Sequence, residues 1–453
     1  MAKKIGKLGE LQKVFQENAI TTETIEINDE VIKELIHLAD GIKDYRHPSY
    51  IWHKLSDIVM IAFFAILSNA NEWSDIEVFA KGKEKWLRKY LELPNGIPTD
   101  DTIRRVISNI ESEHFYKMVI RYLIQVMDQM LEMVEKEEVE KEEETKAKDI
   151  IAVDGKVSCG SKREKTEQPK EEALQSLNVY STSYGLCLGQ EFIKEKSNEI
   201  PAAQEILKTM DLHGTIITAD ALNCQTETVK TIVESGGDYV LGLKGNHKTF
   251  YREMKEFFQD ESLQKEIKGK EKGYKRTVEK EHGGYAIREY YITDEIEWFS
   301  DRKSWKKIKS FGMVKKTLKK KNGEETKEER YYIGSIEADV EEFERSARGH
   351  WVVENRLHWM LDFVFKDDKN TSMAKTGAKN MQILKKIALG ILGIVKNTYK
   401  LSMPKIRYKI SLNYEVEIEK LLSMLNPELI RAILEKNGTN KKESKQKECI
   451  ASS

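Results

Sequence analysis

Three acidic residues that are far apart in the chain stand where carboxylates could do chemistry together. Asp154 closes the strand-like run IIAVD, and Asp220 closes TIITAD. In open α/β sheets ligands gather at the carboxyl ends of the strands, so these two side chains meet if their strands are neighbours. The third acid, Glu354, belongs to the apolar segment RGHWVVENRLHWMLDFVF at 348–365. We expect the three carboxylates to face one another between a sheet edge and a helix.

The segment 348–365 carries a further pattern. Ionisable side chains recur in it every four residues, which places them in one stripe along a helix, whereas Val, Leu, Trp, Met and Phe occupy most other positions. Burying unpaired ionisable groups is expensive, so the stripe needs partners. We expect Glu354 to be the third catalytic carboxylate and the other members to support the site through hydrogen bonds or ion pairs. The stripe consists of His350, Glu354, His358 and Asp362.

Three carboxylates in one cleft repel one another and invite a divalent cation. Oxygen ligands favour Mg²⁺ or Mn²⁺ over zinc. Two such ions roughly 3.5–4 Å apart activate the attacking oxygen and stabilise the leaving oxygen in phosphodiester chemistry, without a nucleotide cofactor. Each acid also has an ordinary explanation, because a strand-end Asp often forms a turn and a Glu on a buried helix is often salt-bridged. The constellation, rather than any one member, predicts a site for two ions.

The elements that must position these residues follow from the hydrophobic patterns. Helix-period apolar residues predict an all-α N-terminal domain over 1–148, which the charge run EKEEVEKEEETKAKD closes. Three strand-like segments, then helix, strand, helix and strand, predict an α/β domain with a mixed sheet over 149–400. A β-rich insertion at about 262–336 includes a hairpin-like alternation around His282. Residues 401–453 are expected to form a helical segment and a charged tail.

The composition narrows the class of protein. The chain has 453 residues, 33% charged and 40% hydrophobic, with a net charge of −1, so any nucleic-acid contact must come from local patches. The four cysteines include no C-x-x-C pair, which argues against a zinc knuckle. The apolar run LSDIVMIAFFAILSNA contains Asp57 and is short for a bilayer span, so it predicts a core helix. From these features we expect a protein of a reducing cytoplasm without a membrane partner; the family resemblance described next implies a bacterial, nucleoid-associated one.

Several blocks of the sequence resemble a known family. IAVDGK, KSNEIPAAQEIL, ITADALNCQ, GGDYVLGLKGNH and RGHWVVENRLHWMLDFVFKDD resemble, in order, those of the DDE transposases of the H-repeat-associated insertion-sequence family, between about residues 30 and 400. The resemblance implies an RNase H-like mixed sheet with a β-rich insertion before the Glu, preceded by a transposase-associated helical domain. Carried over by motif, the catalytic and metal-binding triad is Asp154, Asp220 and Glu354.

The resemblance also implies an activity. It is metal-dependent cleavage at insertion-sequence ends, followed by strand transfer into target DNA, by a homo-oligomer assembled on double-stranded DNA. The alternatives that stay open are an inactive or domesticated DNA-binding relative and a stand-alone RNase H-like nuclease.

Candidate DNA contacts fall into three groups. Cationic side chains beside the motif blocks would clamp phosphates near the metals. The segment PTDDTIRRV would begin a recognition helix with Thr99 as its N-cap. A basic run at 302–321, in a span with the single acid Asp301, would bind the backbone, with solvated surface as the alternative. The residues are Lys156, Lys244 and Arg348; Arg104 and Arg105; and Lys315, Lys316, Lys319, Lys320 and Lys321.

Overall fold

The computed structural model describes residues 6–135, 147–158, 173–193, 199–281, 284–369 and 375–437. Most of the charge run that we expected to close the helical domain, the hairpin turn at His282 and Gly283, and the charged tail from residue 438 lie outside the described residues.

The centre of the protein is a mixed sheet whose first five strands have the expected RNase H-like arrangement. Three strands form an antiparallel meander in the order β3-β2-β1, and two further strands, β4 and β5, lie parallel to β1. Antiparallel hairpins need only short turns, whereas the parallel strands are joined through helices. The strands are β1 (Asp149–Ser158), β2 (Leu174–Ser181), β3 (Leu186–Phe192), β4 (Thr215–Ala219) and β5 (Asp238–Leu243).

The β-rich insertion extends this sheet instead of forming a separate layer. Its last strand pairs antiparallel with β5, and the other strands follow in the order β9-β8-β7-β6, so that the sheet has nine strands. The expected hairpin is present, with Glu281 opposite Gly284. The strands are β6 (Tyr274–Glu281), β7 (Gly284–Thr293), β8 (Ser310–Lys320) and β9 (Glu325–Gly334), preceded by the helices α9 (Lys248–Gln259) and α10 (Glu261–Gly269).

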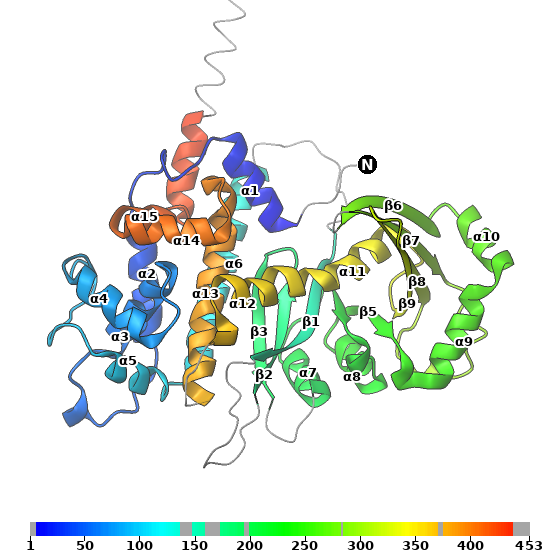
Figure 1. Cartoon of the computed structure of the whole chain (residues 1–453), viewed down its shortest axis with the longest axis horizontal. Helices are drawn as coiled ribbons and strands as arrows, with labels where there is room; N and C mark the ends of the chain where they lie inside the picture. The colour runs from blue at the N-terminus through cyan, green and yellow to red at the C-terminus, as the bar shows by residue number, and fades with distance from the viewer. Residues whose placement is uncertain are drawn as a thin grey trace, which may run out of the picture.

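Helices cover both faces of the sheet, because successive residues of its buried strands point to opposite sides. Ile151 lies in the core beneath α7 (Glu199–Lys208) and α8 (Thr226–Glu234). Its neighbour Ile150 lies in the opposite core with Phe343 of α11 (Val340–Val353). In Figure 1, α11 and α12 (Trp359–Val364) run across the strands toward α13. This crossing brings the segment 348–365 to the sheet.

The N-terminal helices do not have a hydrophobic core of their own. One continuous core joins α1–α6, within residues 7–135, with the helices that follow the segment 348–365. Every residue of α3 is buried, as we predicted for the run around Asp57, whose carboxylate accepts a hydrogen bond from the amide of Leu93 at 2.9 Å. The boundary that we predicted near residue 148 therefore separates two kinds of secondary structure but not two cores. In the described part of the chain, no helix is both long and apolar enough to cross a bilayer.

These helices are α1 (Lys7–Glu17), α2 (Glu30–Asp40), α3 (Leu55–Leu67), α4 (Trp73–Leu87), α5 (Asp100–Ile107), α6 (Ser112–Glu135), α13 (Lys375–Tyr399), α14 (Met403–Leu412) and α15 (Tyr414–Ser423).

One buried side chain, Arg407 of α14, links the helical region with the segment 348–365. Its guanidinium donates to the carbonyls of Ile66 and Ala70 at the end of α3 and to that of Val364 in α12. Its charged group also stacks over the ring of Phe365, 4.2 Å from the centroid.

Replacing Arg407 with Met should lower the free energy of unfolding by about 3 kcal/mol, because buried carbonyls would lose their donors. Urea denaturation would measure the change. Lys405→Met is the matched control, since Lys405 is exposed on the same helix and its replacement should change the stability by less than about 0.5 kcal/mol. Equal effects of the two substitutions would contradict the role given to Arg407.

Candidate active site

The two strand aspartates lie side by side. β1 and β4 are parallel neighbours, and Val153 pairs with Ala219, so the next residue of each strand is one of the two acids. Adjacent strands are about 4.8 Å apart. One detail of the sequence analysis was wrong: Asp154 does not close its strand, because β1 continues to Ser158 through its pairing with β2. Of the two strands, only β4 ends at this point, and the chain turns away from the sheet there.

Glu354 and the two aspartates act on one another electrostatically. The pKa of Asp154 is raised to about 7, first by burial and then by the negative charges of Glu354 and Asp220. Repulsion of this kind requires the three carboxylates to be near neighbours. Glu354 is exposed, whereas the aspartates are half-buried. In the described part of the chain, however, no three acidic, imidazole or thiol groups stand close enough to form a ready-made metal cage.

The helix that carries Glu354 is not regular. Residues Glu354–His358 form a π-helical turn between α11 and α12, in which the amide of Trp359 bonds to the carbonyl of Glu354. Such widened turns are frequent at functional sites. The four-residue recurrence predicted an unbroken α-helix, so the sequence analysis missed this turn. Because of this turn, side chains after Glu354 point in directions that differ from those of a regular α-helix.

The histidines of the stripe lie against the aspartates as neutral imidazoles. His358 places Nδ1 3.4 Å from Asp154 Oδ2, and its Nε2 lies 3.3 Å from the side-chain amide of Asn178. Burial lowers the pKa of His358 to about 3 and that of His350 to about 4. The negative charge of Asp220 acts to raise the pKa of His350, which indicates that this imidazole lies near the Asp220 carboxylate. Both imidazoles are therefore neutral, and His358 is the one with a described contact to an aspartate.

Asp220 forms a turn, which is the ordinary role of an aspartate at the end of a strand, and it also lies beside Asp154. Its Oδ1 accepts hydrogen bonds from the amides of Leu222 and Asn223 and from the Asn223 side chain, at 3.1–3.3 Å. These bonds cap the short helix Ala221–Asn223 and fix the carboxylate at the sheet edge.

A fourth acid, Glu199, was missed by the sequence analysis. It begins α7, and a Cβ atom added to Gly155 would collide with its carboxylate. Burial raises the pKa of Glu199, and the charge of Asp220 raises it further. The only signal in the sequence was its place in the family-like block KSNEIPAAQEIL, since nothing in its spacing links it to the strand aspartates. A larger residue at position 155 would require this carboxylate to move.

Two of the predicted phosphate clamps have acidic partners within the protein. The Lys156 side chain is only 3% exposed and is paired with Asp362, with Asp368 3.7 Å away. Arg348 donates both terminal nitrogens to Glu279 at 2.7 and 2.9 Å. Both cations are thus paired with acids of the protein, because the alternation of β1 turns Lys156 inward and the insertion strand β6 supplies the partner of Arg348. Their contact with DNA stays a prediction.

Other predicted DNA contacts lie at the surface. Lys244 is exposed just after β5, and its charge lowers the pKa of His350. It therefore lies near the acids. Arg104 and Arg105 are exposed on α5, which Thr99 caps as predicted. Arg104 pairs with Asp101 of the same helix.

The basic run at 302–321 is not a free positive patch. In β8, Lys316 pairs with Glu281 at 2.6 Å and Lys319 with Glu325 at 3.3 Å. Lys320 pairs with Glu324 at 2.8 Å, and Lys315 stands opposite glutamates of both neighbouring strands. The sheet brings acids beside lysines that have few acidic neighbours in the sequence. This pairing favours the solvated alternative, and the phosphate patch stays a prediction.

Replacing these lysines with Gln should change the salt dependence of DNA binding only slightly. Five lost phosphate contacts would reduce the slope of log K against log salt by about 4.5. We expect a reduction of about 1 or less, measured by fluorescence anisotropy between low and physiological salt. Lys244→Gln is the single-site comparison, with an expected reduction of about 0.9. A reduction near 4 for the five-lysine variant would restore the patch. The variant replaces Lys315, Lys316, Lys319, Lys320 and Lys321.

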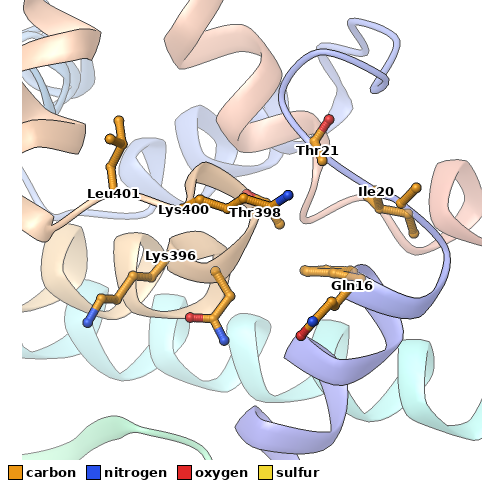
Figure 2. Close-up of a pocket in the computed structure, with 10 residues that line it drawn as sticks. Gln16, Ile20, Thr21, Lys396, Thr398, Lys400 and Leu401 are labelled. Carbon is orange, nitrogen blue, oxygen red and sulfur yellow. The ribbon is translucent and has the colours of Figure 1, made fainter.

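A cavity of about 480 Å³ lies away from all four acids. Figure 2 shows it between the end of α1 and the end of α13, with Gln16, Thr21 and Lys400 among the residues that line it. None of the four acids lines this cavity.

Comparisons with known proteins match most of the chain. The family model described as "Transposase DDE domain" matches residues 145–391, and the one described as "DDE_Tnp_1-associated" matches 36–123. The chain is 32% identical over 385 residues to "Putative transposase YncI" of Escherichia coli O157:H7, covering 84% of this chain and 93% of that protein. It is also 32% identical to "H repeat-associated putative transposase YhhI" of Escherichia coli (strain K12), over 80% of this chain and 90% of that protein.

Among solved structures, the chain aligns with a piggyBac transposase synaptic complex with hairpin DNA. The TM-score is 0.34 and the identity 11%, over 96% of this chain and 83% of that chain. This likeness is too low to inform the site.

Proposed function

The chain belongs to the DDE transposase family, and from this membership we propose that it cuts DNA at insertion-sequence ends and transfers the exposed strand into target DNA. The observation that supports the proposal is the raised pKa of Asp154, about 7, which results first from burial and then from the negative charges of Glu354 and Asp220. A fold alone would gain nothing from this repulsion, whereas a site for cations and phosphate would use it.

We propose that these three carboxylates hold Mg²⁺ or Mn²⁺, as two ions. The donor set fits, because hard divalent cations prefer oxygen ligands and would cancel the repulsion among the acids. When bound, the ions would supply Lewis-acid activation of the attacking oxygen and stabilisation of the leaving oxygen.

The remaining residues act by position. His358, held by Asn178, orients Asp154, while the capping bonds of the short helix orient Asp220. Lys244 binds a phosphate beside the acids. In the first reaction a water oxygen attacks phosphorus and the bond to the 3′-oxygen breaks, which leaves a 3′-hydroxyl. In the second, that hydroxyl attacks a target phosphodiester and displaces another 3′-oxygen. The second reaction breaks one phosphodiester bond and forms another, so it needs no nucleotide cofactor.

The partners follow from this activity. We propose that the protein binds double-stranded element ends and target DNA as a homo-oligomer in the bacterial cytoplasm, with Arg104 and Arg105 of α5 contacting the element end. The acids repel the negatively charged phosphates of DNA, so divalent cations must bind before the DNA or together with it.

The proposal is tested with purified protein, labelled element-end duplex and a target plasmid. We expect nicks and joined products in Mg²⁺ or Mn²⁺, and neither in excess chelator. Nicks without joined products would indicate the stand-alone nuclease. Full activity in chelator would contradict the metal proposal. DNA binding without nicking at high protein concentration would favour a non-catalytic DNA-binding relative, which stays a second candidate because the described acids do not form a ready-made cage.

A further inference from the structure

Three large aromatic side chains are exposed on the segment that carries Glu354. Trp351 is 37% exposed, Trp359 50% and Phe363 50%. By contrast, Leu357 and Leu361 of the same segment are buried in the core. Exposed aromatic surface in a cluster marks an interaction site more often than chance decoration. The question is what covers these rings.

The rings contact one another and nearby cations through their flat faces. Trp359 and Phe363, one helical turn apart, stack with centroids 4.6 Å apart and planes inclined by 14°. The guanidinium of Arg330 lies 4.1 Å from the Trp351 ring, and the Lys366 ammonium lies 5.2 Å from the Phe363 ring. Arg330 also bonds to Glu328. The cluster is therefore aromatic with cations on its rim.

The π turn brings this cluster to Glu354. In a regular α-helix, residues five apart point about 140° away from each other. Here the amide of Trp359 bonds to the carbonyl of Glu354, which is the widened turn that brings such residues toward the same side. Trp351 precedes Glu354 by three residues and lies on the adjacent side of α11. Aromatic rings therefore lie before and after the carboxylate along one side of the helix.

The charges of the cluster favour a polyanion as its occupant. Arg356 is exposed within the π turn, and Arg330 and Lys366 lie at the rings. Flat rings with cations are what proteins use to stack bases of unpaired nucleic acid, whereas paired bases within a duplex have no free face to offer. An apolar protein surface would not need this rim of positive charge.

We propose that Trp359 and Phe363, with Trp351 on the other side of Glu354, form a stacking platform for unpaired bases next to the phosphate that is cut. This inference rests on the proposed function and names the form of its substrate: an element end whose last base pairs are open. Opening the duplex there would let the acids reach the phosphate, and the stacked bases would offset the cost of unpairing.

The experiment compares two DNAs of the same sequence, one fully paired and one with three unpaired nucleotides at the end. Binding is measured by anisotropy in Ca²⁺ or without metal, so no cutting is needed. Trp359→Ala and Phe363→Ala should each weaken binding of the open DNA roughly tenfold and that of the paired DNA little. Trp359→Phe keeps a ring and should retain most of the preference. A 2-aminopurine placed at an unpaired position should be quenched by the wild type and not by Trp359→Ala.

Trp52→Ala is the matched control, because Trp52 is 67% exposed and lies outside the segment that carries Glu354. It should affect both DNAs equally. Equal losses for both DNAs in the Trp359 and Phe363 variants, or no binding by the wild type, would overturn the platform. A changed oligomeric state of Trp359→Ala in light scattering would do so too and would assign the rings to a second copy. If the wild type prefers open DNA but never nicks it, the platform stands and the catalytic proposal fails.

Discussion

Glu354→Gln is expected to reduce metal-dependent nicking by several orders of magnitude and to leave DNA binding intact. Gln keeps the length and shape of the side chain and removes one of the three charges that we propose to hold the ions. Loss of that ligand removes activation of the attacking oxygen and stabilisation of the leaving one together. Single-turnover nicking of an element-end duplex measures the rate, and anisotropy measures binding.

Asp362→Asn is the matched control for this variant. It makes the same chemical change two turns further along the segment, where the carboxylate pairs with Lys156 and not with the aspartates. The rate should fall far less. Stability should fall instead, because Lys156 is buried and would keep only its longer contact with Asp368. Circular dichroism separates a lost fold from a lost ligand. A folded Asp362 variant that is inactive, beside a Glu354 variant that still cuts, would reverse the assignment.

The sequence predicted the parts of the fold that local patterns encode. Strand-like runs that end in Asp154 and Asp220 were enough to predict adjacent acids, because parallel strands that are neighbours present the same ends at one edge. The buried helix around Asp57 followed from its uninterrupted apolar run. The connection of Glu354 with these aspartates came from the family resemblance, because the sequence separation between Asp220 and Glu354 does not indicate a contact in space.

The features that the sequence did not reveal depend on pairing between distant segments. Lys315 and Lys316 looked unneutralised along the chain, but strand register places glutamates of β6, β7 and β9 beside them. Lys156 looked like a phosphate ligand until strand alternation turned it toward Asp362. Glu199 reaches the site only because α7 begins against Gly155. The π turn at Glu354 has no compositional signature, since its residues would also fit a regular helix.

A second large effect is expected on stability. In the metal-free protein the pKa of Asp154 is about 7, above its ordinary value of 3.8. The folded state therefore binds more protons than the unfolded state between these values, so this group's contribution to stability is lost as pH rises from about 4 to about 7. The difference corresponds to about 4 kcal/mol as an upper limit. Coupling among the neighbouring acids makes about 2 kcal/mol the better expectation.

The histidines oppose this trend. Their pKa values are lowered to about 3 and about 4, so the unfolded state binds more protons than the folded state up to about pH 6.5, and their contribution rises with pH over that range. The pH profile of the wild type alone is therefore a sum of opposite trends. Asp154→Asn isolates the aspartate, because both proteins contain His350 and His358.

Asp154→Asn should be more stable than the wild type by about 2 kcal/mol at pH 8 and about equal to it near pH 4. Urea denaturation in chelator at several pH values measures this difference. Adding Mg²⁺ should stabilise the wild type more than the variant, because ions bound to the folded state alone shift its equilibrium. Asn223→Ala tests whether any change at the sheet edge has the same effect, and it should instead destabilise at every pH, since Asn223 is buried and donates to Asp220. A stability difference between the wild type and Asp154→Asn that does not depend on pH would mean that the pKa of Asp154 is not raised in the folded protein, and the electrostatic support for the proposed site would be lost with it.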